Sequence, residues 1–149
     1  MTTLVAAVTE AKRRSELPVF AGGHSFGGRM ASHMAAEKAA EVQGLVFCSF
    51  PLHPSKKPST LRAAHLPDIK VPMLFLSGTR DTLADPDLLQ STLNALNPKP
   101  HLHWLQTADH SYKILKRTRQ EPPTVFQEMA TVTRHFMDHL TPLNTEHGV

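Results

Sequence analysis

Apolar residues along the chain follow two patterns, and the first has the spacing of an amphipathic helix. Residues 2–15 carry one apolar stripe with the charged residues off it, and residues 124–140 place their apolar side chains on one helical face. Asp85 and Pro86 suit the cap and the first position of a further helix. Helices are therefore predicted over four segments, namely residues 2–15, about 26–41, about 86–96 and about 124–140.

The second pattern is a short continuous apolar run, and four such runs are predicted to be strands. The run over 44–50 is bounded by turn residues, which is typical of a strand covered on both faces in a parallel sheet. Pro18 can open a strand at 19–21 but could not lie inside a central one. The predicted strands are residues 19–21, 44–50, 71–77 and 100–106.

The order of these elements predicts the fold class. Strands separated by helices imply right-handed crossovers, so we expect an α/β fold with a parallel sheet of about four strands flanked by helices. The prolines of residues 51–70 predict a loop with at most one short helical turn. We expect a single domain over residues 1–140 and a disordered tail over 141–149. In such sheets active sites lie at the carboxyl ends of the strands.

The turn after the first predicted strand reads Gly23-His24-Ser25-Phe26-Gly27. A Gly-x-Ser-x-Gly turn between a strand and a helix holds its serine hydroxyl clear of the backbone, as a nucleophile requires. The amide of Phe26 would then lie at a helix N-terminus, where it can donate to a developing oxyanion. The alternative is a glycine-rich connection with an incidental serine. We expect Ser25 to be a nucleophile and the Phe26 amide an oxyanion donor.

A carboxylate follows the third predicted strand at Asp81. A carboxylate at that point can orient a histidine and stabilise its protonated form. Asp85 and Asp87 are the rivals, but each has a sufficient structural role as a helix cap or a first-turn acid. Asp81 has no such role, so we expect it to be the catalytic acid.

A histidine follows the fourth predicted strand at His110, which we expect to be the general base. Of the other histidines, His101 and His103 lie within the predicted strand. His135 and His139 are four residues apart on a helix, a spacing that can bind zinc, but they lack a third ligand. A solvated helix face is the better interpretation of that pair.

Three segments resemble the elbow, acid and histidine motifs of the α/β-hydrolase superfamily. They are Gly23-His24-Ser25-Phe26-Gly27-Gly28, Ser77-Gly78-Thr79-Arg80-Asp81 and Ala108-Asp109-His110-Ser111. Within that superfamily the chain is most similar to the small dienelactone-hydrolase-like group, over roughly residues 2–140. The resemblance implies hydrolysis of a carboxylic ester, a lactone or a related acyl bond in a small-molecule substrate, with no metal and no organic cofactor.

The resemblance also implies a larger fold than the four strands predicted here. A full member has about eight strands, and this chain supplies only the last four. The loop that usually provides a second oxyanion donor does not precede Ser25, and the strand at 19–21 would be an exposed sheet edge. We therefore expect a homo-oligomer that pairs through that edge. The alternative is an absent amino-terminal segment that belongs beside this edge. The alternatives to a serine hydrolase are a non-catalytic binding or scaffold protein and a gene fragment without a function of its own.

Charge and composition bear on the remaining classes of function. The formal net charge of +3 is mild, and the cations of residues 113–119 have only Tyr112 beside them, so no nucleic-acid partner is expected. Cations in that loop and in 51–70 could instead favour acidic esters.

No apolar run approaches the roughly 20 residues that span a membrane, so no membrane partner is expected. Positively charged residues follow the first apolar residues, whereas in a secretory signal they come before the apolar stretch. This order predicts a cytoplasmic location. Cys48 is alone, which excludes an internal disulfide.

Overall fold

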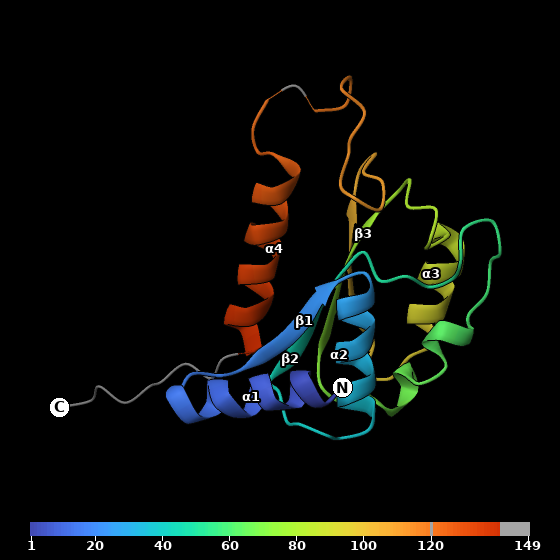
Figure 1. Ribbon diagram of the computed structural model, residues 1–149. Helices are drawn as coiled ribbons and strands as arrows, with labels where there is room; N and C mark the ends of the chain where they lie inside the picture. The colour runs from blue at the N-terminus through green and yellow to red at the C-terminus, as the bar shows by residue number, and fades with distance from the viewer. Residues whose placement is uncertain (120, 141–149) are drawn as a thin grey trace.

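A four-stranded parallel sheet forms the centre of the computed structural model, which describes residues 1–119 and 121–140 (Figure 1). Each strand pairs with its neighbours in sequence, in the order β1-β2-β3-β4. The strands are β1 (Phe20–His24), β2 (Gly44–Cys48), β3 (Met73–Gly78) and β4 (His101–Leu105). This arrangement confirms the predicted α/β fold class. The predicted tail over 141–149 lies outside the described residues.

Helices cover both faces of the sheet, with α4 on one side and α1, α2 and α3 on the other (Figure 1). Two 3-10 turns, η1 and η2, lie in the loop between β2 and β3, where at most one was predicted. The bounds are α1 (Thr2–Arg14), α2 (Phe26–Ala36), η1 (Leu61–Ala63), η2 (Leu66–Asp68), α3 (Pro86–Asn94) and α4 (Val125–Leu140).

Side chains of the central strands alternate between two apolar cores. Phe47 and Phe75 pack into the core beneath α1, α2 and α3, and Val46 and Leu74 pack into the core beneath α4. All four residues are buried. Both faces of β2 and β3 are therefore covered, which explains their continuous apolar sequence.

Helix α2 ends at Ala36, so the prediction that it extends to residue 41 is wrong. Lys38 adopts a left-handed φ of 52°. Its N–H donates to the carbonyl of Ala35, and the Ala39 N–H donates to that of Met34, at 3.1 and 3.0 Å. These two bonds form a Schellman motif, which usually has a glycine at the left-handed position. A lysine there gives no sequence signal that the helix ends.

Strand β1 runs to His24, past the glycines that were predicted to end it at residue 21. A Cβ atom on Gly22 would lie 2.0 Å from the carbonyl oxygen of Val46. The glycine therefore permits a close approach of β1 to β2 rather than a turn. Strand β2 ends at Cys48, two residues earlier than predicted, because Ser49 turns the chain with a φ of 54°.

Strand β1 is an edge of the sheet, since β2 is the only strand it pairs with among the described residues. The four strands direct their carboxyl ends to one end of the molecule, because all of them are parallel. The residues that follow β1, β3 and β4 therefore meet at that end.

Candidate active site

Ser25 lies on a tight turn between β1 and α2. Its backbone has φ 51° and ψ −117°, a conformation that non-glycine residues rarely adopt. The Ser25 N–H donates to the Cys48 carbonyl at 2.9 Å, which ties the turn to the neighbouring strand. A Cβ atom on Gly28 would lie 2.6 Å from the Gly23 carbonyl oxygen, whereas one on Gly27 would meet open space. On the helix side of Ser25 the contact that requires a glycine is therefore at Gly28, outside the five-residue pattern.

Ser25, His110 and Asp81 form a continuous chain of hydrogen bonds. The Nε2 atom of His110 lies 2.8 Å from Ser25 Oγ, and its Nδ1 atom lies 2.8 Å from Asp81 Oδ2. The side chain of Asp81 is fully buried, and that of His110 is 21% exposed. The structure thus brings together the three residues that the sequence singled out.

The directions of these hydrogen bonds follow from the groups involved. A carboxylate can only accept, so the Nδ1 atom of His110 carries the proton that points to Asp81. Its Nε2 atom then has a free lone pair, which accepts the hydroxyl proton of Ser25. The second oxygen of Asp81 accepts the backbone N–H of Leu83 at 2.8 Å, which fixes the carboxylate. This arrangement can remove a proton from Ser25 when its oxygen attacks an electrophile.

Asp85 has the structural role expected of it. Its side chain accepts the N–H of Leu88 at 2.9 Å and so caps α3, and its own N–H donates to the His53 ring at 2.9 Å. Asp87 is exposed in the first turn of α3. Asp81 is therefore the acid that faces His110.

The loop after β4 positions His110 through a second carboxylate, which the sequence analysis did not single out. Asp109 Oδ1 accepts the backbone N–H groups of Ser111 and Lys113, both at 2.9 Å. These bonds fold the chain tightly around His110. An Asx turn is common where an aspartate lies next to small polar residues, so the segment from Asp109 to Ser111 held a weak signal for it.

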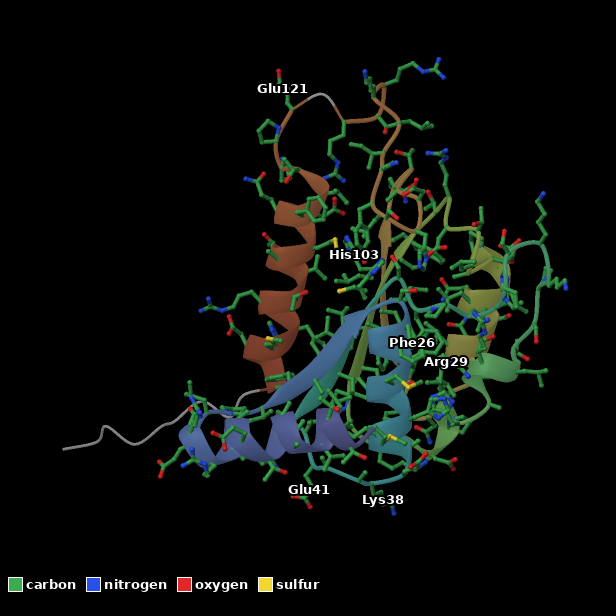
Figure 2. The ribbon with its side chains drawn as sticks, viewed as in Figure 1. Phe26, Arg29, Lys38, Glu41, His103 and Glu121 are labelled. Atoms are coloured by element: carbon green, nitrogen blue, oxygen red, sulfur yellow. The ribbon has the colours of Figure 1, made fainter. Side chains whose placement is uncertain are left out.

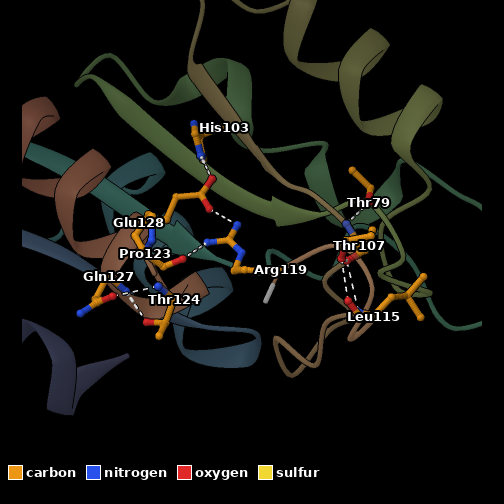
Figure 3. Close-up of polar contacts among 10 residues, drawn as sticks. Thr79, His103, Thr107, Leu115, Arg119, Pro123, Thr124, Gln127 and Glu128 are labelled. Atoms are coloured by element: carbon orange, nitrogen blue, oxygen red, sulfur yellow. Dashed lines mark hydrogen bonds and ion pairs between the residues drawn. The ribbon is translucent and has the colours of Figure 1, made fainter. Parts of the chain in front are cut away.

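Both ends of the loop over 106–124 are fixed to the rest of the domain (Figure 3). At its start the Thr107 N–H donates to Thr79 Oγ1 at 2.8 Å. Near its end Arg119 forms an ion pair with Glu128 on α4, and Glu128 also bonds His103 of β4 at 2.7 Å. Burial would raise the pKa of Glu128, but the hydrogen bonds from Arg119 and His103 outweigh it and hold that pKa below its ordinary value.

A family profile described as an alpha/beta hydrolase domain matches residues 1–138. The chain belongs to the alpha/beta hydrolase domain family. The strand–turn–helix at Ser25 and the parallel sheet are features of this fold.

Three solved structures resemble this alpha/beta hydrolase domain. TT1662 from Thermus thermophilus is 25% identical with a TM-score of 0.66, over 91% of this chain and 60% of its own. Dienelactone hydrolase from Anabaena variabilis is 22% identical with a TM-score of 0.63, over 91% of this chain and 55% of its own. XC6422 from Xanthomonas campestris is described as an α/β serine hydrolase without a lid. It is 21% identical with a TM-score of 0.61, over 94% of this chain and 55% of its own. The chain thus spans 60% or less of these three structures.

Two hollows in this alpha/beta hydrolase domain lie away from Ser25. The larger, about 690 Å³, is lined by residues that include Lys38 and Glu41, at the end opposite to the loop of Glu121 (Figure 2). The smaller, about 310 Å³, lies between β4 and α4 and is lined partly by His101, His103, His135 and His139. Ser25 instead lies beside the side chain of Phe26, which is 66% exposed.

The described part of the domain offers no metal centre. Among residues 1–119 and 121–140, no three histidine, cysteine, aspartate or glutamate side chains are grouped so that they could hold an ion. Cys48 is half-buried, and burial raises the pKa of its thiol, which disfavours the reactive thiolate. None of the helices described here is long and apolar enough to cross a membrane.

Proposed function

We propose that this alpha/beta hydrolase domain is a serine hydrolase that cleaves a carboxylic ester, a lactone or a related acyl bond. The observation that carries the proposal is the pair of 2.8 Å contacts that join Ser25 and Asp81 to the two ring nitrogens of His110. Similarity to dienelactone hydrolase and to a serine hydrolase supports the acyl substrate class.

In the proposed reaction Ser25 Oγ attacks the carbonyl carbon of the substrate while His110 Nε2 takes the hydroxyl proton. Asp81 stabilises the resulting imidazolium. The tetrahedral intermediate then collapses, and His110 gives its proton to the leaving alkoxide. Water hydrolyses the acyl-serine by the same route, with His110 taking a proton from the water and returning it to Ser25. The products are a carboxylic acid and an alcohol, or one hydroxy acid from a lactone.

The oxyanion of the intermediate would be bound by the backbone N–H of Phe26. Phe26 is the first residue of α2, and the first amides of a helix have no intrahelical acceptor. The helix dipole adds a partial positive charge at the same point. This group therefore lies where negative charge would develop.

The second oxyanion donor is proposed to come from outside residues 1–140, either from another segment or from a second copy of the chain at the free edge of β1. Loss of one such donor costs other hydrolases about 10²–10³ in rate. A chain that acts with the Phe26 amide alone is therefore expected to be a slow catalyst.

A non-catalytic binding or scaffold protein is the second candidate. The observation that favours it is that Ser25 lines neither of the two hollows described above. A binding protein would need no pocket beside its serine.

A fluorophosphonate probe tests the proposal, because it labels only a serine activated by a base. Labelling of the full chain is expected to be lost in Ser25→Ala and in His110→Ala. Ser111→Ala is the matched control, since this exposed serine is next to His110 and its backbone N–H, rather than its hydroxyl, donates to Asp109. Its labelling should equal that of the unmodified chain. A folded chain that neither labels nor hydrolyses p-nitrophenyl acetate would favour the scaffold.

A further inference from the structure

His110 lies in the long loop over 106–124, in which the described residues, 106–119 and 121–124, form no helix or strand. A loop of this length keeps conformational freedom unless specific contacts restrict it. The contacts of Thr107 and Arg119 restrict its two ends. Asp81 holds only the Nδ1 side of the His110 ring. The turn of Asp109 folds the backbone around His110 locally, but its hydrogen bonds do not tie that backbone to the turn of Ser25.

A contact that does so is made by His24, the residue immediately before Ser25. Its Nε2 atom lies 2.9 Å from the backbone oxygen of His110, which is 86 positions away in the sequence. A carbonyl oxygen can only accept, so His24 Nε2 carries a proton and donates it. The bond joins the turn of Ser25 directly to the residue that carries the base.

The ring of His24 is held from its other sides by aromatic contacts. Its centroid lies 5.2 Å from that of His110 and 5.6 Å from that of Tyr112. Tyr112 in turn makes an edge contact with Phe126 at 5.8 Å, which connects the group to α4. Although His24 is exposed, these two ring contacts and the hydrogen bond restrict the orientation of its ring.

We propose that His24 is a positioning residue that latches the backbone of His110 to the turn of Ser25. This proposal rests on the proposed function, because it assigns His24 a part in keeping Ser25 Oγ and His110 Nε2 at reacting distance. The Nε2 atom of His24 cannot act as a base, because it carries the proton that it donates to the carbonyl and has no free lone pair. The same hydrogen bond occupies this atom, so it does not bind substrate. Its effect is on geometry, where a displacement of about 1 Å can cost about 10²-fold in rate.

Two substitutions at position 24 separate the hydrogen bond from the ring. His24→Phe keeps an aromatic ring and removes the donor, and His24→Gln keeps a donor at a similar distance from the backbone. With p-nitrophenyl acetate we expect kcat to fall about tenfold in His24→Phe with KM little changed, and to fall about twofold in His24→Gln. His135→Phe, which replaces an exposed histidine on α4, is the matched control and should retain the full kcat.

A proton NMR measurement reports on the same latch without any turnover. The Nδ1–H of His110 that points to Asp81 should give a far-downfield resonance, which we expect to broaden or shift in His24→Phe and to be kept in His24→Gln. Nitrogen-15 spectra of the unmodified chain should show His24 with its proton on Nε2. The nitrogen-15 measurement needs no variant, so it tests the proposal even if His24→Phe fails to fold.

Different results overturn the two proposals. A chain that does not react with fluorophosphonate but shows both NMR signatures would overturn the proposed function and leave the latch in place. A His24→Phe variant with unchanged kcat and an unchanged His110 resonance would overturn the latch. A His24 ring whose only proton is on Nδ1 would overturn it as well.

Discussion

Two serine–histidine pairs in this molecule have almost the same hydrogen-bond length but differ in which group donates. Ser25 Oγ lies 2.8 Å from His110 Nε2, and Ser32 Oγ lies 2.7 Å from His65 Nε2. Ser32 donates its only proton to the carbonyl oxygen of Arg29 at 2.6 Å. Its oxygen therefore accepts from His65, whereas Ser25 donates to His110.

The surroundings explain this difference. His110 has the buried carboxylate of Asp81 on Nδ1, and because a carboxylate can only accept, the proton of the ring lies on that side. His65 bonds no carboxylate among the described contacts. Burial, with the nearby charges of His33 and Arg29, lowers the pKa of His65 to about 4, against a weak opposing effect of Asp68.

A serine beside a histidine is therefore not by itself a catalytic pair. Ser32 lies inside α2 with no exposed surface, so no substrate could reach it. Ser25 lies on a turn at the carboxyl end of the sheet, where its hydroxyl faces the base. The acid partner and the accessible turn distinguish the candidate site from a structural hydrogen bond.

The largest expected difference is between alanine substitutions of the two serines. Ser25→Ala should lower kcat by about 10⁴–10⁶ because it removes the nucleophile. Ser32→Ala should leave kcat unchanged and lower the free energy of unfolding by about 1–2 kcal/mol, because it leaves the His65 N–H without its acceptor. Esterase assays and urea unfolding measure the two effects. A loss of activity in a folded Ser32→Ala would contradict the distinction.

The next largest effect is expected at the acid partner. Asp81→Asn should lower kcat by about 10³–10⁴, because an amide can donate to Nδ1 and so hold His110 in the wrong tautomer. Asp68→Asn is the matched control near His65 and should change kcat little. Steady-state kinetics of both variants tests this, and equal losses in the two would show that charge rather than orientation is responsible.

His65, which bonds the hydroxyl of Ser32 rather than a carboxylate, predicts a pH dependence of stability. The pKa of His65 is about 4 in the folded chain, below its ordinary value of 6.5, so the unfolded chain binds more protons between these values. Stability is thus fully present above pH 6.5 and is lost as pH falls toward 4. After allowance for solvent screening, the His65 contribution should be about 1–2 kcal/mol. Urea unfolding at pH 7 and pH 5 should give a smaller difference in His65→Asn than in the unmodified chain.

The smallest effect is expected from the distant end of the loop that carries His110. Glu128→Gln weakens the contacts with Arg119 and His103 while the latch of His24 and the bond to Asp81 remain. We expect kcat to fall about two- to fivefold. Because the ion pair of Arg119 is lost, the melting temperature should also fall by a few degrees. If Glu128→Gln lowered kcat as much as Asp81→Asn does, the end of the loop held by Glu128, rather than Asp81, would control the position of His110.

The order of the strands and helices could be predicted because it depends on local patterns. A continuous apolar run such as 44–50 can be recognised from adjacent residues alone, and so can the cap at Asp85. The end of α2 could not, because Lys38 occupies a left-handed position where glycine is usual. The same limit applies to β1, whose length depends on how closely Gly22 approaches Val46.

By itself the sequence determined the fold class and the three side chains proposed to carry the reaction, because Ser25, Asp81 and His110 each follow a strand of a parallel sheet. Only the tertiary structure decided how they are held. The bond from His24 to the backbone of His110, the turn of Asp109 and the proton direction at Ser32 depend on the path of loops and on distances across the fold. A sequence pattern specifies which strand end a residue occupies, whereas a hydrogen bond requires two groups to meet within about 3 Å.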